Sequence, residues 1–249
     1  MNPSWLEPEW PAPPGVRALS TTRHGGVSAA PYASLNLGGH VGDSTNAVAE
    51  NRRRLMAMAH LPAEPEWLAQ VHGATVADLD LPGAPVSADA AFTRQPGRVC
   101  AILTADCLPI LLAAQTGDLV GAAHAGWRGL AGGVIEAAVQ ALSVPPQDLL
   151  AWLGPAIGPR HFEVGAEVRE VLLGSDPGAW CAFARNPRGR FLADLGLLAR
   201  RRLERLGVRR IFGGGECTYA NIDRYFSHRR DGITGRHATL IWREPPHGR

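Results

Sequence analysis

Three segments carry side chains that bind soft or borderline metals. They are residues 70–73 (Gln-Val-His-Gly), 105–107 (Ala-Asp-Cys) and 124–127 (His-Ala-Gly-Trp). The Cys107 thiolate and the His72 and His124 imidazoles suit zinc, and three protein ligands leave a fourth position open, as in catalytic zinc sites. The spacing of the three residues does not by itself establish a zinc site. A buried cysteine that packs as a small hydrophobic residue, beside two unrelated histidines, would show the same spacing.

The residue before Cys107 is acidic and adds a second chemical possibility. Asp106 and Cys107 would face opposite sides of a regular strand. Pro109 predicts that the strand is interrupted here, which would let both side chains reach one site. Asp106 is then a candidate general acid or base, or a residue that orients another. An aspartate that only caps a turn remains the alternative.

Every basic residue other than histidine is an arginine, because the 25 residues counted as lysine plus arginine include no lysine. Schiff-base chemistry and P-loop nucleotide binding are therefore excluded. An anionic substrate must be held by arginine, backbone N–H groups or metal. The best candidates for this role are Arg23, Arg128 and Arg229, which lie in or beside glycine-containing loops. A surface position is the alternative for each of them.

The composition indicates an ordinary globular protein of 249 residues with a net charge of +2. This charge is too small to indicate nucleic-acid binding, and the arginine runs at 52–54 and 200–202 fit solvated helix faces. Residues 99–114 are apolar but are interrupted by Asp106 and Pro109, so we expect no membrane span. Residues 1–16 lack the features of a signal peptide. Without a C-x-x-C pair, the four cysteines indicate reduced thiols and a cytoplasmic protein.

The pattern of apolar residues predicts a mixed α/β fold. We expect one catalytic domain over residues 16–249, preceded by an extended, proline-rich arm over residues 1–15. Strands are predicted at 16–21, 67–71, 89–93, 99–103, 110–114, 119–123, 149–153, 210–212 and 238–242. Helices are predicted at 44–59, 130–142, 165–173 and 192–206. Strands and helices do not alternate strictly, which favours mixed sheets with flanking helices over a doubly wound parallel sheet. The Gly117-Asp118 turn would bring Cys107 and His124 together.

The motifs together closely resemble the YfiH family, also called the laccase-domain or peptidoglycan-editing-factor family. The resemblance runs through nearly the whole chain in the family's order. The matching residues are 20–26, 35–38, 70–73, 104–109, 124–129, 154–158, 217–218, 226–231 and 234–236. The family usually has tyrosine where this chain has His228, and a single threonine where it has Thr21-Thr22.

This resemblance implies a zinc ion held by His72, Cys107 and His124. It also implies a purine nucleoside enzyme that phosphorolyses adenosine, inosine, guanosine and methylthioadenosine and deaminates adenosine. Purine nucleoside and phosphate are then the expected partners, with no nucleic acid or membrane. For phosphorolysis we expect Arg23, Arg128 and Arg229 to hold phosphate. For deamination we expect metal-activated water to attack the purine, with Asp106 as the proton shuttle.

Three other functions remain alternatives. A multicopper oxidase needs about ten histidines in H-x-H pairs, whereas no two of the nine histidines are one residue apart, so only a single-copper polyphenol oxidase is compatible. A Cys–His amidase that edits peptidoglycan precursors would use Cys107 as nucleophile and His124 as base. Backbone N–H groups at residues 126–128 would form its oxyanion hole. A non-catalytic module would fill the fourth zinc position, with Cys217 as the candidate ligand.

Overall fold

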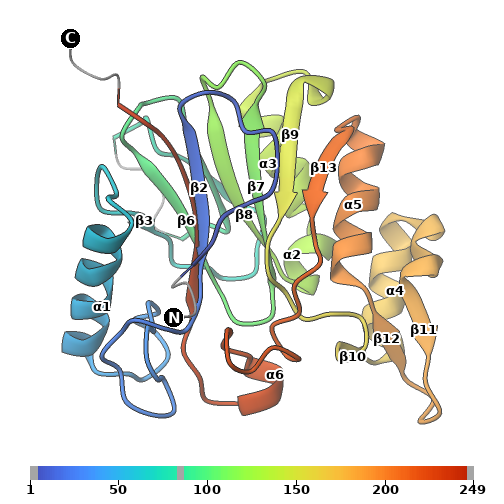
Figure 1. Cartoon of the computed structure of the whole chain (residues 1–249). Coiled ribbons are helices and arrows are strands. Elements are labelled where there is room, and N and C mark those ends of the chain that lie inside the picture. The colour runs from blue at the N-terminus through green and yellow to red at the C-terminus, as the bar shows by residue number, and fades with distance from the viewer. Residues whose placement is uncertain (1–4, 83–86, 246–249) are drawn as a thin grey trace.

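A computed structural model describes residues 5–82 and 87–245, and it consists of two facing β-sheets with helices on both outer sides (Figure 1). A five-stranded sheet has the order β1-β2-β14-β6-β3, and a six-stranded sheet has the order β13-β9-β7-β8-β5-β4. Both contain parallel and antiparallel neighbours. The predicted fold class, mixed sheets with flanking helices in a single domain, is therefore confirmed.

The five-stranded sheet has its last strand near its centre. β14 pairs antiparallel with β2 on one side and with β6 on the other. β1 extends the β2 edge and β3 lies parallel to β6 at the opposite edge. The strand bounds are Trp5–Leu6 for β1, Val16–Thr21 for β2, Glu66–Trp67 for β3, Val99–Thr104 for β6 and His237–Arg243 for β14. Part of the predicted N-terminal arm is thus a strand of this sheet.

The six-stranded sheet is built around a long central hairpin, β7 and β8. Every residue of these two strands is buried, which explains their continuous apolar sequences. Leu108 pairs with Ala125 and Pro109 with His124, so the hairpin brings Cys107 next to His124 as predicted. The strands are β4 Val76–Asp78, β5 Ala90–Thr93, β7 Leu108–Ala114, β8 Val120–Ala125, β9 Leu149–Leu153 and β13 Arg210–Gly213.

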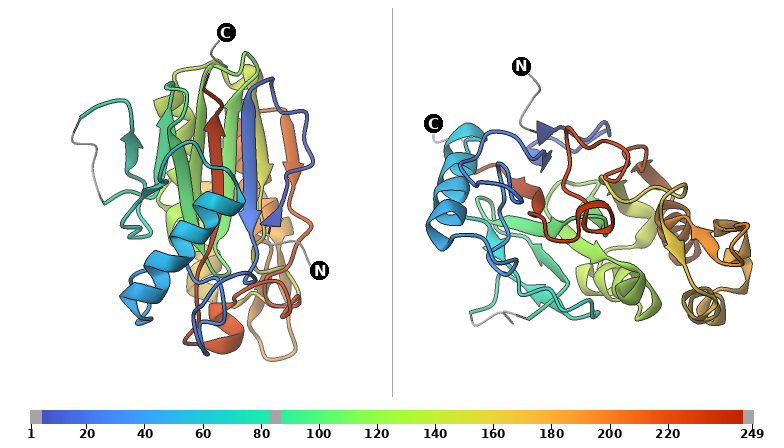
Figure 2. Two further views of the ribbon diagram at one scale, coloured as in Figure 1. Left: turned by 60° about the vertical axis from the view of Figure 1, so that its left-hand side comes forward. Right: turned by 90° about the horizontal axis from the view of Figure 1, so that it is seen from below.

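The apolar core forms three layers between and outside the sheets. Ile102 and Ile241 of one sheet pack with Leu111 and Val120 of the other between the sheets. Helix α1, Thr45–Met58, covers the outside of the five-stranded sheet, and α3 and α5 cover the outside of the six-stranded sheet (Figures 1 and 2). The other helices are α2 Trp127–Ala131, α3 Val134–Leu142, α4 Ala166–Ser175, α5 Leu195–Leu206 and α6 His228–Asp231.

A small third sheet lies beside α4, with the order β10-β12-β11. The sequence patterns did not predict these short strands. Their bounds are Glu163–Val164 for β10, Phe183–Arg185 for β11 and Phe191–Ala193 for β12. Two 3₁₀ helices, Pro146–Asp148 and Pro177–Ala182, complete the described elements.

Local backbone conformations explain where the structure differs from the predicted elements. The predicted helix 130–142 is two helices, because Gly133 is left-handed with φ 84° and separates α2 from α3. Pro109 lies inside β7 and does not interrupt it. The interruption comes earlier, at residues 105–107, where Asp106 has φ 95°. The strand predicted at 67–71 ends at Trp67, and residues 68–71 form a loop that leads to His72.

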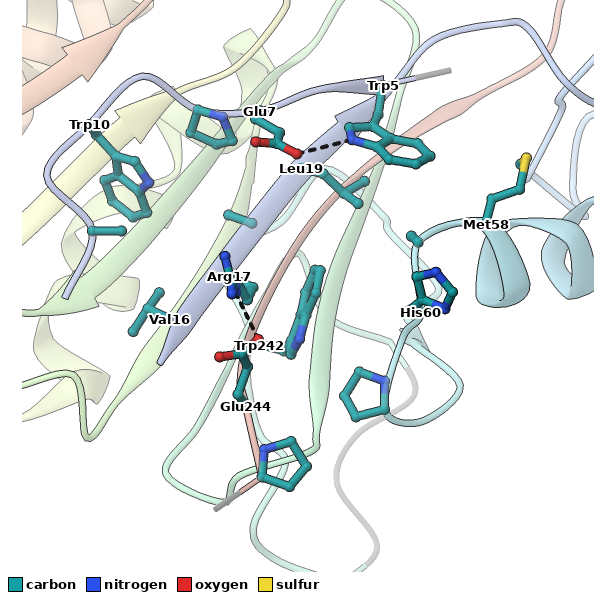
Figure 3. Close-up of a pocket in the computed structure, with 16 residues that line it drawn as sticks. Trp5, Glu7, Trp10, Val16, Arg17, Leu19, Met58, His60, Trp242 and Glu244 are labelled. Atoms are coloured by element: carbon teal, nitrogen blue, oxygen red, sulfur yellow. Dashed lines mark hydrogen bonds and ion pairs between the residues drawn. The ribbon is translucent and has the colours of Figure 1, made fainter. Parts of the chain in front are cut away.

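The outer face of the five-stranded sheet carries a groove of about 670 Å³, beside the N-terminal strand β1 (Figure 3). Its walls include the indoles of Trp5, Trp10 and Trp242. Arg17 and Glu244 form an ion pair on its floor at 2.8 Å. None of the predicted site residues lines this groove.

Candidate metal centre

Three separate segments bring His72, Cys107 and His124 together at one end of the sheets. His72 follows the loop after β3, Cys107 ends the turn between β6 and β7, and His124 is near the end of β8. One ligand atom from each residue lies within 4.8 Å of the other two. Among the described residues this is the one group of histidine, cysteine or acidic side chains close enough to hold a metal ion.

The spacing of these ligand atoms fits a tetrahedral metal ion. Zinc–sulfur and zinc–nitrogen bonds of roughly 2.3 and 2.1 Å place neighbouring ligand atoms about 3.5 Å apart. Cys107 Sγ lies 3.9 Å from His72 Nε2, and the two imidazoles meet edge to face at 4.8 Å between ring centroids. One sulfur and two nitrogens are ligands that zinc and copper both accept. The three residues therefore can hold one such ion and leave a coordination position free.

The electrostatic surroundings favour a thiolate at Cys107. Burial alone would raise the pKa of this thiol, but the neighbouring His124 and His72 lower it to about 6. Burial alone would lower the pKa of His124, but Cys107 and Asp89 raise it to about 9. The two side chains thus stabilise each other as a thiolate and an imidazolium, and a metal ion would replace the shared proton.

Gly126 provides the space that the Cys107 sulfur occupies. A Cβ atom at position 126 would lie 2.8 Å from Cys107 Sγ and 3.3 Å from His72 Cδ2. Both separations are shorter than ordinary van der Waals contacts. Close packing against two of the three ligands therefore requires a glycine at position 126.

Asp106 lies in the same cavity as the three ligands, and both its carboxylate oxygens are hydrogen bonded. Oδ1 accepts a 2.7 Å bond from the Thr218 hydroxyl, and Oδ2 accepts a 2.7 Å bond from the Arg229 backbone N–H. Its positive φ turns the chain so that Asp106 and Cys107 both line the cavity. Asp106 thereby ties the β6–β7 turn to the C-terminal segment that contains α6.

The cavity has a volume of about 510 Å³, enough for a nucleoside-sized molecule. Its walls combine aromatic and polar side chains. Trp127 and Phe162 are the aromatic lining residues, and Gln70 is held against the β6 backbone by two 2.8 Å bonds to Leu103. The remaining lining residues are His40, His72, Leu103, Thr104, Ala105, Asp106, Cys107, His124, Arg128, Ile157, His228, Arg229 and Arg236.

Two of the three predicted anion-binding arginines line this cavity. Arg128 lies over the Trp127 ring, and Arg229 lies over Phe162 while donating to the Glu163 carbonyl. Arg23 is not among the lining residues, and its guanidinium donates to the carbonyls of Ala33 and Ile222. A substrate role for Arg23 stays a prediction without a contact that supports it.

Sequence reasoning did not identify two charged residues of this site. Arg236 lines the cavity, and within the described ranges no carboxylate lies within ion-pair distance of it. Its segment, Thr234-Gly235-Arg236, matched the family pattern without an assigned role. Asp89 is buried behind His72 and His124 and accepts bonds from both segments. The sequence offered one signal, an aspartate between two alanines in the apolar stretch Ala88-Asp89-Ala90.

The structure also places His228, which departs from the family pattern, and Cys217, the candidate fourth zinc ligand of a non-catalytic module. His228 lines the cavity at the start of α6, and its Nδ1 lies 2.7 Å from the Gly232 carbonyl. Cys217 is outside the ligand cluster, and its sulfur instead accepts bonds from the backbone N–H groups of Gly158 and Ala220. The four cysteines are free thiols.

The fold and the site define a mixed α/β protein with a His₂Cys cluster that could hold a metal ion, in a nucleoside-sized cavity. Residues 17–244 match the family described as multi-copper polyphenol oxidoreductase laccase, and the chain belongs to this family, which includes the YfiH proteins. It is 53% identical over 240 residues to purine nucleoside phosphorylase YfiH of Escherichia coli (strain K12), covering 95% of this chain and 98% of the relative.

Solved structures agree with this assignment. The crystal structure of Neisseria meningitidis protein NMB0706 matches with a TM-score of 0.93 and 46% identity, over 98% of this chain and all of that one. YlmD from Geobacillus stearothermophilus matches with a TM-score of 0.91 and 35% identity, over 98% of each chain. Across the described residues, every helix is too short or too polar to cross a bilayer.

Proposed function

We propose that this protein is a zinc-dependent purine nucleoside phosphorylase that also deaminates adenosine. The observation that carries the proposal is the opening of the His72, Cys107 and His124 cluster into a cavity that also presents arginines without carboxylate partners among the described residues. The name of the Escherichia coli relative, which is 53% identical to this chain, supports the substrate class. The proposed catalytic unit is residues 16–249, and the cavity draws on segments from His40 to Arg236 within it.

The chain's own residues supply most of the proposed substrate contacts. The cations of Arg128, Arg229 and Arg236 hold phosphate, which must approach the ribose C1′ from a fixed side. The aromatic side chains of Trp127 and Phe162 in the cavity lining would contact the purine. A bound zinc ion supplies a Lewis acid that polarises an oxygen ligand and lowers the pKa of water. His124 and Cys107 act as its ligands together with His72.

Asp106 is the proposed proton carrier in deamination. Its two hydrogen bonds use two of about four acceptor positions of an ionised carboxylate, so it can still accept a proton from an attacking water. Water would attack the purine C6 and phosphate the ribose C1′, so the one cavity serves both reactions with the nucleoside in two different orientations. The proposed location is the cytoplasm, where a thiolate ligand stays reduced.

The test is to incubate purified, zinc-loaded protein with adenosine, with and without phosphate, and to quantify adenine, inosine and bound metal. We expect phosphate-dependent adenine, phosphate-independent inosine and about one zinc ion per chain. Cys107→Ala should remove the metal and both activities, whereas Cys181→Ala, at an exposed cysteine outside the cavity, should retain them. A zinc-loaded protein that converts no nucleoside would contradict the proposal.

The proximity of the two side chains favours one second candidate function, amide cleavage by Cys107 with His124 as the base that has taken the thiol proton. The two functions respond oppositely to a chelator. Zinc removal should abolish nucleoside conversion, since the metal supplies its Lewis acid, whereas it would free the thiolate for amide attack. Amide cleavage of a peptidoglycan precursor that rises on chelation would favour the second function. Metal analysis of the purified protein also separates zinc from a single copper.

A further inference from the structure

Asp89, immediately before β5, is in direct contact with both histidine ligand segments. Its side chain has no solvent exposure. The carboxylate accepts bonds from the backbone N–H groups of Val71, His72 and Gly73 and from the His124 ring. The four donors satisfy this buried carboxylate. No role was assigned to Asp89 by the sequence motifs.

One of these bonds selects the form of the His124 ring. His124 Nδ1 lies 2.8 Å from Asp89 Oδ1, and an ionised carboxylate can only accept, so Nδ1 carries the proton. In a neutral imidazole the lone pair is then on Nε2, the nitrogen left free for a metal ion. The His124 backbone N–H also donates to the Asp89 carbonyl at 2.7 Å. Ring and backbone of His124 are thus both fixed by the same residue.

The other three bonds hold His72 in an unusual backbone conformation. His72 has φ 61°, the left-handed region, which costs a non-glycine residue roughly 1–2 kcal/mol. The N–H groups of Val71, His72 and Gly73 converge on the Asp89 carboxylate at 3.1, 2.9 and 2.7 Å. This convergence requires the tight turn, and the turn directs the exposed His72 side chain toward Cys107.

We propose that Asp89 is a positioning residue that presets both imidazole ligands before a metal ion binds. It acts through His72 and His124 and does not itself line the cavity. The inference rests on the metal site of the proposed function and adds a residue that determines its affinity. Loss of such an outer partner of a metal-binding histidine typically weakens metal binding by roughly 10–100-fold.

The test is Asp89→Asn, which keeps the shape of the side chain but replaces one acceptor oxygen with a donor. Either the 71–73 turn or the His124 ring then loses its partner. We expect the zinc dissociation constant, measured by competition with a fluorescent chelator, to rise about 10–100-fold. Cobalt(II) added in place of zinc should show weaker or shifted visible d–d bands, which report the ligand geometry independently of activity.

Asp176→Asn is the matched control. Asp176 is also buried and accepts bonds from a backbone N–H, of Gly178, and from Arg201, but it is outside the metal cavity. Its substitution should lower the melting temperature and leave zinc affinity and the cobalt spectrum unchanged. If Asp89→Asn does not fold, the zinc affinity of Asp89→Glu tests the positioning role instead. This variant keeps the charge but displaces the carboxylate by about one methylene in a fully buried space, so we expect it to bind zinc more weakly as well.

The outcomes distinguish failure of the positioning role of Asp89 from failure of the proposed metal site. Wild-type zinc affinity in Asp89→Asn, or in Asp89→Glu where the first variant is unfolded, overturns the positioning role and leaves the proposed function intact. A wild-type protein that binds neither zinc nor cobalt overturns the metal site of the proposed function instead. Weakened zinc binding in Asp176→Asn as well would show that any buried aspartate matters equally, and would also overturn the specific role of Asp89.

Discussion

Asp106 Oδ2 accepts a 2.7 Å hydrogen bond from the backbone N–H of Arg229, which lies 123 residues later in the chain. The other oxygen of Asp106 accepts from the Thr218 hydroxyl. One side chain in the β6–β7 turn therefore fixes two points of the C-terminal segment beside the His72, Cys107 and His124 cluster. Arg229 lies in α6, so this bond links the β6–β7 turn to that short helix.

The bond geometry predicts that two substitutions of Asp106 have different effects. Asp106→Asn can keep both bonds, with its oxygen facing Arg229 and its amide facing the Thr218 oxygen, and asparagine tolerates positive φ. It should stay close to wild-type stability and retain zinc, but lose most deaminase activity, because an amide cannot accept the proton. Asp106→Ala should in addition lose about 1–3 kcal/mol of unfolding free energy. Denaturant unfolding and inosine formation measure the two effects, and full deaminase activity in Asp106→Asn would contradict a proton-carrier role.

A methyl group at position 126 should weaken metal binding without unfolding the protein. Gly126 has φ −68°, so alanine fits the backbone, but its Cβ would press on Cys107 Sγ at 2.8 Å. The sulfur must move and the ligand geometry must open. We expect Gly126→Ala to bind zinc at least about tenfold more weakly, by analogy with other perturbations of ligand orientation. Gly174→Ala, where nothing lies within 4 Å of the added carbon, is the control and should retain wild-type affinity.

Arg236 should matter for phosphate more than for nucleoside. Its guanidinium donates to the carbonyls of Thr234 and Gly235 through one nitrogen and has donors left for an anion. Loss of a charge-assisted bond is worth about 1.5–3 kcal/mol, so Arg236→Gln should raise the KM for phosphate roughly 10–100-fold. Steady-state kinetics with each substrate varied in turn provide the measurement. Arg17→Gln, on the far groove, should behave as wild type; an unchanged phosphate KM in Arg236→Gln would remove this residue from the phosphate site.

Acid should destabilise the protein partly through His237. Burial, with a smaller contribution from Arg236, lowers the pKa of His237 from 6.5 to about 3. The unfolded chain therefore takes up this proton first as the pH falls below about 6.5, and the unfolding free energy drops by about 1.4 kcal/mol per pH unit. Between pH 6 and 4.5, His237→Gln should show a slope smaller by about one proton in denaturant titrations. An identical slope in the variant and the wild type would show that His237 is protonated in the folded state.

The sequence predicted the central hairpin and therefore the approach of Cys107 to His124. The apolar runs on both sides of Gly117-Asp118 are local signals, and β7 and β8 are buried along their full length. The conformation of His72 could not be predicted in the same way. Its turn depends on the carboxylate of Asp89, which is distant in sequence, and no residue in 70–73 indicates this partner.

The arginines show the same limit. Glycine-containing motifs selected Arg23 and Arg229 equally, but only the three-dimensional structure shows that Arg229 lines the cavity and Arg23 does not. Arg23 donates to Ala33 and Ile222 and is absent from the cavity lining, whereas Arg236, unassigned by the motifs, is part of it. Likewise, the sequence predicts one continuous helix through Gly133, because a single glycine does not show from sequence whether its φ is positive.

The placement of β14 has a consequence for biosynthesis. This strand, the last in the described chain, pairs with β2 and β6 and so lies between strands that the ribosome releases much earlier. Until it emerges, β2 and β6 each present an unpaired edge, the type of surface through which nascent chains aggregate. Such distant pairings give the topology a high contact order and slow folding. Arg236, which lines the cavity, comes directly before this strand, so the cavity is completed only when the C-terminal segment is in place.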